Sequence, residues 1–165
     1  ARREWFGADP AFDAACANRF AGACRSALDG RLGTLAETPE GALALVLLLD
    51  QLPRNIHRGT AGAFAGDAAA RAVALAAIAR RYDEGMAPAF KLFFYLPFEH
   101  AESLGEQNRA CALIGELGNA EWLRYAERHR AIIARFGRFP HRNRILGRRE
   151  TPEEGAFVAA SGGPF

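Results

Sequence analysis

Residues 38–55 read Thr-Pro-Glu-Gly-Ala-Leu-Ala-Leu-Val-Leu-Leu-Leu-Asp-Gln-Leu-Pro-Arg-Asn. Thr38 followed by Pro39 is a helix-start signal, because threonine can cap free backbone N–H groups and proline fits the first helical position. The run from Leu43 to Leu49 is apolar on every side, and a helix of this kind has to be buried rather than lie on a surface. We therefore expect a helix from about Pro39 to Leu52 to be the central element of a helical domain.

The end of this helix is polar. Asp50 would lie in the last turn, where the helix dipole disfavours a carboxylate, so we expect it to have a cationic partner. Pro53 is expected to force the residue before it out of helical geometry and to end the helix. The sequence thus places an unusual polar segment directly after its most buried helix.

Proline and capping signals divide the rest of the chain into further helices. They are expected at Asp9-Pro10 to about Leu28, Asp67 to about Tyr82, Pro88 to Pro97, Glu106 to Leu117, Asn119 to Phe136, and Thr151 to about Ala160, with a further helical turn over Phe98 to Glu102. No segment shows strand alternation with a hairpin turn. The class is therefore all-α, with antiparallel neighbours in either a bundle or a stack of helix pairs.

Length and composition predict one globular domain, residues 1–165. The chain has a mass of 17.9 kDa, and 50% of its residues are hydrophobic and 24% charged, which is ordinary for a folded protein. No apolar run approaches the roughly 20 residues that span a bilayer, so we expect no membrane association. Cys16, Cys24 and Cys111 fit no metal-binding spacing, and we expect neither a metal nor a cofactor. The expected location is the cytoplasm.

The basic residues are distributed unevenly. Lys91 is the only lysine, so 21 − 1 = 20 of the basic residues are arginine. From Arg128 to Arg149 there are eight arginines and two histidines with no acidic residue. Such a run is a solvated face, an anion site or a nucleic-acid patch. The net charge of only +2 argues against a general polyanion binder, so nucleic acid is the partner that we expect least.

Three polar clusters each follow an expected helix end. They are Asp50 to Asn55, Pro97 to Glu102, and Gly137 to Asn143. In a strictly alternating up-and-down array these three clusters would lie along the same edge. The inference fails if Phe98 to Leu104 forms an independent helix, because the direction of the later helices would then be reversed.

The three clusters, with Arg58 shortly after the first, supply the candidate site residues. Arginine forks match carboxylates, so ion pairing within the protein would account for Asp50 and the glutamates, while surplus arginines could bind a phosphate or carboxylate. Candidate ligand-binding residues are Arg54, Asn55, Arg58, Glu102, Arg138, Arg142 and Asn143. Because histidine titrates near neutral pH, the catalytic candidates are His141 and His100 with Asp50 and Glu99. The alternative is structural: histidines bonded to turn carbonyls, and asparagines that occupy turns.

The same motifs give the chain a family resemblance. It resembles a bacterial family of uncharacterised proteins, domain of unknown function 924. The likeness is carried by Trp5-Phe6, Phe12-Asp13, Leu43 to Arg58, Phe64 with Asp67, Tyr95-Leu96-Pro97 with His100 and Glu102, Gln107, Arg135 to Arg148, and Thr151-Pro152-Glu153-Glu154. The resemblance implies an all-helical fold similar to tetratricopeptide-repeat superhelices, with about 7–8 helices in antiparallel pairs. It implies no established activity and no assigned catalytic residues.

The chain departs from the family at two places. Family members usually continue upstream of Trp5, so we expect that a first helix of the family is missing here. Leu35 stands where many members have a tryptophan, which affects the expected packing around that position and leaves the motifs unchanged.

Four functional hypotheses follow, and they leave open whether the protein is an enzyme. The first is a cytoplasmic helical protein that binds a small anionic ligand, phosphate or carboxylate, at an arginine-rich edge. The second is an interaction scaffold that binds an acidic peptide. The third is an acid–base enzyme that uses His141 or His100 with Asp50 or Glu99. Nucleic-acid binding by Arg128 to Arg149 comes last.

Overall fold

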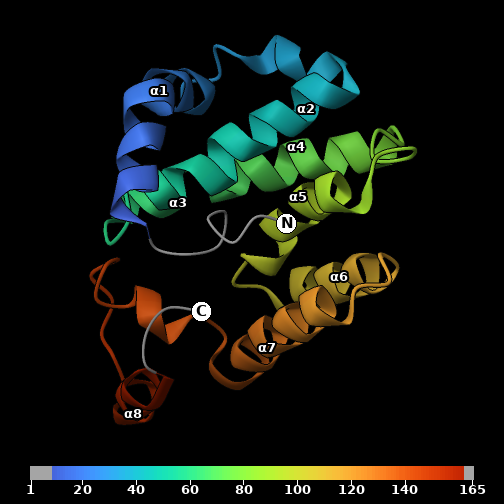
Figure 1. Ribbon diagram of the computed structural model, residues 1–165. Helices are drawn as coiled ribbons and strands as arrows, with labels where there is room; N and C mark the ends of the chain where they lie inside the picture. The colour runs from blue at the N-terminus through green and yellow to red at the C-terminus, as the bar shows by residue number, and fades with distance from the viewer. Residues whose placement is uncertain (1–8, 162–165) are drawn as a thin grey trace. The chain divides into compact units, whose positions relative to one another are not determined.

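The computed structural model describes residues 9–161, and this part of the chain is all-α, without a strand (Figure 1). The predicted fold class is confirmed. The α-helices are α1 (Pro10–Leu28), α2 (Pro39–Val46), α3 (Leu52–Ile56), α4 (Asp67–Ala79), α5 (Pro88–Glu99), α6 (Leu104–Gly115), α7 (Ala120–Phe136) and α8 (Pro152–Ser161). Short 3-10 turns are η2 (Gly33–Glu37), η4 (Ala61–Phe64) and η5 (Pro140–Arg142), and η3 (Leu47–Gln51) is a π turn.

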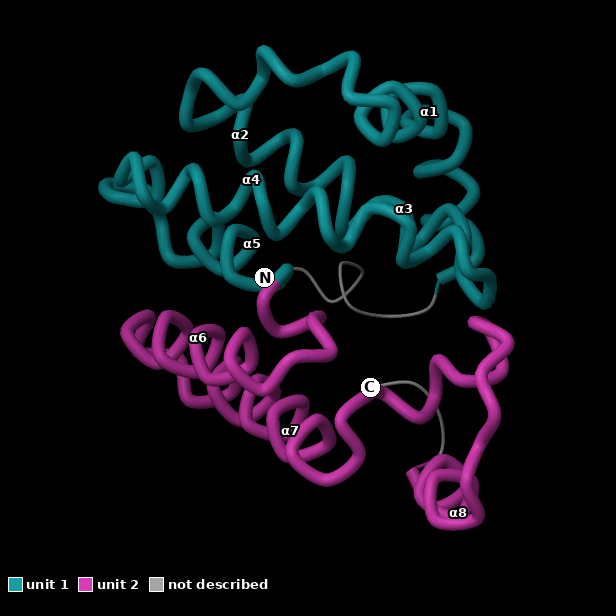
Figure 2. The backbone as a smooth tube through the Cα atoms, turned by 180° about the vertical axis from the view of Figure 1, so that it is seen from behind, with its two compact units in different colours: residues 1–97 teal, residues 98–165 magenta. Residues whose placement is uncertain are grey.

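The chain divides into two compact units (Figure 2). Unit 1 is Ala1–Pro97 and contains α1 to α4 and most of α5, and unit 2 is Phe98–Phe165 and contains α6, α7 and α8. Within unit 1, α2 packs against α4 and α1 against α3; within unit 2, α6 and α7 form an antiparallel hairpin (Figure 1). The single domain over residues 1–165 and the superhelical arrangement remain predictions.

Helices α1, α2 and α7 begin where the capping signals predicted. The Asp9 side chain accepts hydrogen bonds from the backbone N–H groups of Ala11 and Phe12, at 2.9 and 3.2 Å. The Thr38 hydroxyl accepts one from Gly41 N–H at 3.2 Å, and Asn119 caps α7 in the same way. These side chains satisfy N–H groups that have no partner within the first turn of a helix.

The apolar stretch is the core of unit 1, as predicted. Leu45, Val46 and Leu49 are buried, and no residue from Ala42 to Asp50 is exposed. Leu45 and Leu49 pack with Ala27 of α1 and Ala70 of α4. Helices on two sides therefore cover this stretch, which agrees with its lack of a polar face.

The prediction that Pro53 ends this helix is wrong. Leu52 has helical angles, φ −62° and ψ −39°, and the chain continues as α3 to Ile56. The helix accommodates the proline through the π turn, in which Leu52 N–H bonds to the Leu47 carbonyl five residues back. Because proline has no N–H, Pro53 cannot donate the usual helical hydrogen bond to the carbonyl four residues earlier, which is that of Leu49. The backbone of Gly66 lies against that carbonyl: a Cβ on Gly66 would be 2.1 Å from the Leu49 oxygen.

The prediction that a helix stops at Pro97 is also wrong. Helix α5 contains Pro97 and continues to Glu99. Proline inside a helix costs about 3 kcal/mol, and the burial of Phe94 and Phe98, 0% and 1% exposed, offsets a cost of this size. Phe98 to Glu102 is therefore no separate helical turn, since Phe98 and Glu99 end α5 and Glu102 lies in the bend before α6.

Other helix ends differ from expectation by about two or three residues: α4 ends at Ala79, and α6 spans Leu104–Gly115.

One stretch of the structure is apolar enough to be considered as a candidate membrane-spanning segment. We expected no segment of spanning length, but Ala61–Ala79 has 19 residues and a mean hydropathy of 1.4, so by length and composition it could cross a membrane. Only 28% of it is buried. Soluble proteins also contain such helices, and α4 packs against α2, so this stretch is weak support for a membrane span.

Arg81, two residues after the end of α4, allows a stability prediction. Arg81 has φ +61°, a left-handed conformation that costs a residue with a Cβ about 1–2 kcal/mol. Its ion pair with Glu84 is exposed and contributes little. Arg81→Gly is therefore expected to raise the free energy of unfolding by about 0.5–1 kcal/mol, measured by urea denaturation. Arg80→Gly is the matched control, because Arg80 has φ −90°; an equal gain in both variants would contradict the explanation.

Candidate functional site

Asp50 and Arg54 form the first polar cluster, in unit 1. The Asp50 side chain is fully buried, and its expected cationic partner is Arg54, whose Nη1 lies 3.3 Å from Asp50 Oδ1. The same Nη1 donates to the Asp50 carbonyl at 2.9 Å, to Asp67 Oδ1 at 2.9 Å and to the Ala63 carbonyl at 3.2 Å. Arg54 thus joins the π turn to the start of α4, which is a structural role.

Asn55 and Arg58 contact a carboxylate on α1. Asn55 Nδ2 donates to Asp13 Oδ1 at 2.8 Å. Arg58 holds both oxygens of Asp13, through Nε at 2.7 Å and Nη2 at 2.9 Å. The Arg58 hydrogen bond is the main reason that the pKa of Asp13 lies below its ordinary value. These contacts tie α3 to α1, and a ligand-binding role for Arg54, Asn55 and Arg58 remains a prediction.

In unit 2, Glu102 and Arg148 hold the segment that carries the third motif. Arg148 Nη1 and Nη2 donate to the two Glu102 oxygens at 2.6 and 2.9 Å. Glu102 Oε1 accepts the backbone N–H of Phe139 at 2.8 Å, and Arg148 Nη2 donates to the Phe139 carbonyl at 3.1 Å. Burial raises the pKa of Glu102, but the bonds from Arg148 and Phe139 outweigh it and keep this pKa below its ordinary value. We call this arrangement the Glu102–Arg148 clamp.

Arg138 fixes the same segment to α8. Its Nε and Nη2 donate to the two oxygens of Glu154 at 2.6 and 2.8 Å. Glu154 also accepts from Thr151 N–H and donates its own N–H to the Thr151 hydroxyl, which is the predicted capping box. These bonds, that of Arg138 first, hold the pKa of Glu154 well below its ordinary value. Arg138 therefore has an internal partner.

Two histidines of unit 2 lie beside the ring of Phe139, which is fully buried. The ring of His129 on α7 lies 5.5 Å from it and that of His141 lies 5.6 Å from it, centroid to centroid. The Arg142 guanidinium stands 4.5 Å from the same ring centre, and the His100 ring lies 6.5 Å from that of His129. We call Glu99, His100, His129, His141 and Arg142 the histidine cluster.

His129 is the most enclosed histidine of this cluster. Its Nδ1 lies 2.9 Å from the Tyr125 carbonyl and 3.2 Å from Glu99 Oε1. The pKa of His129 is lowered to about 4, mainly by burial, with the charges of His100, Arg142 and His141 acting in the same direction and the Tyr125 carbonyl in the opposite one. The ring is then neutral at pH 7, Nδ1 carries the proton toward these two oxygens, and Nε2 keeps its lone pair.

Gln107 supports the turn that carries Glu99 and His100. It is fully buried on α6, and its Nε2 donates to the carbonyls of Glu99 at 2.5 Å and Ala101 at 2.8 Å. These carbonyls flank His100 and lie where α5 ends, so Gln107 supplies donors that a helix C-terminus lacks.

Sequence reasoning selected His100, His141, Glu99 and Arg142 and missed His129. The structure places His141 and Arg142 beside Phe139. It places His100 and Glu99 beside His129, which is the buried member of the cluster and also contacts Phe139. The available signal was a histidine within the apolar face of α7, between Tyr125 and Ile132. The fourth catalytic candidate, Asp50, lies in unit 1 with Arg54. Asn143 is fully buried next to Arg142 in the chain.

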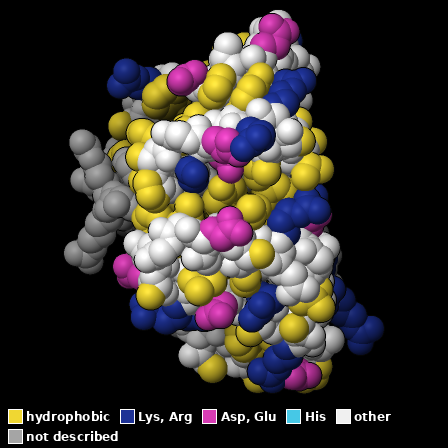
Figure 3. All heavy atoms as spheres, turned by 90° about the vertical axis from the view of Figure 1, so that its right-hand side faces the viewer, with side chains coloured by type: hydrophobic (Ala, Val, Ile, Leu, Met, Phe, Trp, Pro, Cys, Tyr) yellow, Lys and Arg dark blue, Asp and Glu magenta, His cyan; other side chains and the backbone are white. Residues whose placement is uncertain are grey.

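At least four of the eight arginines in the arginine-rich run have partners within the fold. Arg135 pairs with Glu153, Arg138 with Glu154 and Arg148 with Glu102, and Arg142 is buried against Phe139. On the face in Figure 3, basic and acidic side chains are interspersed. Within residues 9–161, no group of three or more His, Cys, Asp or Glu side chains could hold a metal ion, and the three cysteines are buried free thiols.

The clamp leads to a second stability prediction. Glu102→Ala removes the acceptor of Phe139 N–H and the partner of a half-buried arginine, so we expect a loss of about 2 kcal/mol in the free energy of unfolding. Glu102→Gln keeps one acceptor oxygen and should lose about half as much. Glu84→Gln, which breaks the exposed pair with Arg81, should change stability by less than about 0.5 kcal/mol. Equal effects of Glu102→Ala and Glu84→Gln in urea denaturation would disprove the role of the clamp.

Comparisons with other proteins agree with the resemblance seen in the sequence. The chain matches the family described as "Bacterial protein of unknown function (DUF924)" over residues 1–162. It is similar to the solved structure of a protein of unknown function, ATU0120 from Agrobacterium tumefaciens, with 47% sequence identity and a TM-score of 0.91. That alignment covers 95% of this chain and 89% of the other. No curated protein matches the chain. The chain therefore belongs to the bacterial DUF924 family.

Proposed function

We propose that the protein binds a small anionic ligand at the histidine cluster and that His129 takes up a proton from solvent when the ligand binds. The observation that carries the proposal is the pairing of His129 with Glu99 beside three further groups that carry or can carry positive charge. A carboxylate facing Nδ1 orients a neutral imidazole so that Nε2 can accept a proton, which is how a general base is arranged.

The charges around His129 favour an anion. Arg142, His100 and His141 all oppose a proton on His129, and the same field attracts a negative group to this position. His100 and His141 are half-exposed, whereas His129 is buried. A ligand arriving from solvent would therefore meet His100 and His141 first and have its charge balanced near Arg142.

The test measures the number of protons taken up on binding as well as the binding itself. A bound anion next to His129 raises its pKa from about 4, so binding at pH 5 should take up close to one proton, while binding at pH 8 should take up none. Calorimetry with inorganic phosphate and a panel of small carboxylates, in buffers of different ionisation enthalpy, measures this uptake. A ligand at 100 times its dissociation constant should also stabilise the protein by about 2.7 kcal/mol.

Variants separate the roles of the residues. His129→Gln should bind the same anion without proton uptake, and Arg142→Gln should weaken binding about tenfold or more. Arg144→Gln is the matched control, because Arg144 is exposed and only two residues away. The proposal fails if no anion of the panel binds, or if proton uptake persists in a folded His129→Gln variant.

A further inference from the structure

Helix α8 is docked through a buried glutamate. Within residues 152–161, Glu154 is the one buried residue, 3% exposed. A helix on a protein surface normally buries an apolar stripe, whereas α8 buries a carboxylate that accepts two hydrogen bonds from the Arg138 guanidinium. The contact of α8 with the rest of unit 2 therefore depends strongly on this ion pair.

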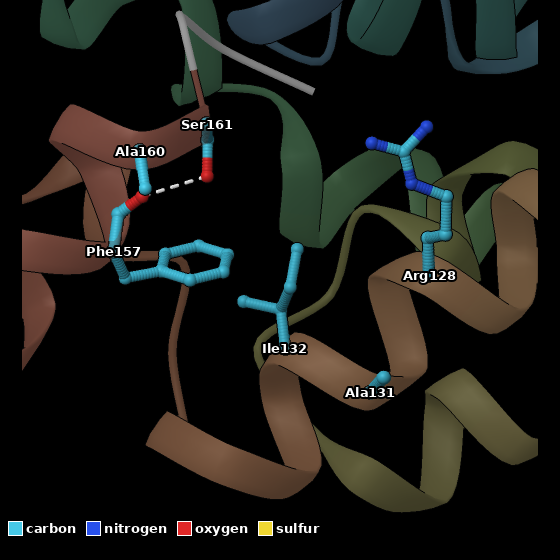
Figure 4. A pocket seen from close by; sticks show the side chains of 6 residues that line it. All are labelled: Arg128, Ala131, Ile132, Phe157, Ala160 and Ser161. Carbon is cyan, nitrogen blue, oxygen red and sulfur yellow. Dashed lines mark hydrogen bonds between the residues drawn. The ribbon is translucent and has the colours of Figure 1, made fainter.

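Phe157 supplies apolar contact to the same helix, and it is half-buried. Its ring lies 5.0 Å from the Phe136 ring, centroid to centroid, and packs against the core cluster that contains Phe139. In Figure 4 this ring points toward Ile132 of α7, beside a pocket of about 440 Å³ between the two helices. Segments that bury few apolar side chains open at a lower free energy than the rest of a protein. We therefore expect α8 to open while α6 and α7, which bury more of their residues, stay folded.

Helix α8 also holds the turn η5, which carries His141 and Arg142 of the histidine cluster. The two elements pack against each other. Glu154 binds Arg138, two residues before η5, and the pKa of Glu154 is lowered first by Arg138 and further by Asn143, the residue directly after η5. Glu154 thus acts on both sides of the turn, so the position of η5 depends on the docking of α8.

We propose that α8 and η5 open together, and that this opening regulates the affinity of the histidine cluster for its anion. An undocked helix of ten residues is only marginally stable in water, so the release of α8 also unfolds it. His141 and Arg142 then lose the fixed positions that the proposed anion site requires. Linkage demands the reverse effect as well, so a bound anion holds α8 closed by the same factor by which closure raises the affinity. The regulation rests on the proposed anion binding, whereas the joint opening of α8 and η5 does not.

Amide hydrogen exchange of the full chain, measured by NMR, tests the joint opening without a ligand. The N–H group of Asn143, which donates to the Pro140 carbonyl at 2.9 Å, reports on η5. It should exchange through the same opening as the amides of α8, and faster than those of α6 and α7. Glu154→Gln removes the charge that binds Arg138 and should speed exchange in α8 and η5 at least about tenfold, with α6 and α7 unchanged.

Two further variants control this result. Glu153→Gln is the matched control, because Glu153 lies next to Glu154 on α8 and its ion pair with Arg135 is exposed; it should change exchange by less than about threefold. Thr151→Ala is a milder way to weaken α8. It removes the hydroxyl that accepts Glu154 N–H and should speed exchange in α8 and η5 about fivefold.

Inorganic phosphate then tests the regulation. At about 100 times its dissociation constant it should slow exchange in α8 and η5 at least about tenfold. The proposal is overturned if Glu154→Gln speeds exchange in α8 and leaves that in η5 unchanged, if α8 exchanges as slowly as α6 and α7, or if bound phosphate leaves the exchange of α8 unchanged. Phosphate that does not bind wild type contradicts the proposed function and with it the regulation, while exchange in Glu154→Gln still decides the joint opening.

Discussion

Gly66→Ala is expected to lower the free energy of unfolding by about 3 kcal/mol, the upper end of what overpacking normally costs. A Cβ at this position would meet three backbone atoms of Leu49, the oxygen at 2.1 Å, the carbonyl carbon at 2.9 Å and Cα at 3.1 Å. Backbone atoms cannot rotate away as a side chain can, so α4 would have to separate from the π turn. For a chain of this length the melting temperature should fall by about 10 °C, which thermal denaturation followed by circular dichroism will measure.

Gly22→Ala is the matched control for this variant. Gly22 lies inside α1, is exposed, and has no atom within 4 Å of a Cβ position. Alanine is the better helix former by about 0.8–1 kcal/mol, so the same substitution should stabilise the protein here. A Gly66→Ala variant as stable as wild type would show that α4 and the π turn are not in close backbone contact.

The stability of the protein should fall by about 3 kcal/mol between pH 7 and pH 4 because of His129 alone. Its pKa is about 4 in the folded protein and 6.5 as the ordinary value. Between these values the unfolded chain binds a proton that the folded chain does not, so stability decreases as pH falls, by about 1.4 kcal/mol per pH unit. Above pH 6.5 this contribution is fully present, and below pH 4 it is lost.

The pH range in which His129 lowers stability differs from the range in which the carboxylates do so. Asp13, Glu102 and Glu154 also have lowered pKa values, but their contribution is lost mainly below pH 5. Urea denaturation between pH 6.5 and 5.5 therefore reports on His129. His129→Gln should remove most of the slope in this interval, while the exposed His57→Gln should retain it. A slope unchanged in His129→Gln would mean that this histidine is not buried in neutral form.

The sequence predicts what depends on local chemistry. Asp9, Thr38 and Asn119 cap helices because their side chains reach N–H groups two or three residues away, and such short contacts are visible in the spacing of residues. Pro53 and Pro97 were misjudged for the opposite reason. Proline normally breaks a helix, but here a π turn and buried aromatic packing, both of them tertiary features, allow the helix to continue.

The candidate site likewise contains residues that the sequence could predict and residues that it could not. His100, His141, Glu99 and Arg142 stand out because they lie in polar motifs, and they do gather in one cluster, His141 and Arg142 beside Phe139 and the other two beside His129. His129 was missed because the other buried residues of α7, Ala126, Ile132 and Ile133, are apolar, and only the fold brings Glu99 to it. The partners of the arginines, such as Asp13 for Arg58 and Glu154 for Arg138, are 45 and 16 residues away, too far for spacing to reveal.

The Glu102–Arg148 clamp also constrains when the cluster can form during synthesis. Its two residues are 46 positions apart, and a ribosome adding about 5–20 residues per second needs a few seconds to make the intervening segment. Until Arg148 has been made, the Phe139 carbonyl has no hydrogen bond from Arg148, and Glu102 has no guanidinium partner. We therefore expect the segment that carries Phe139 and His141 to take up its final position only after Arg148 has been translated.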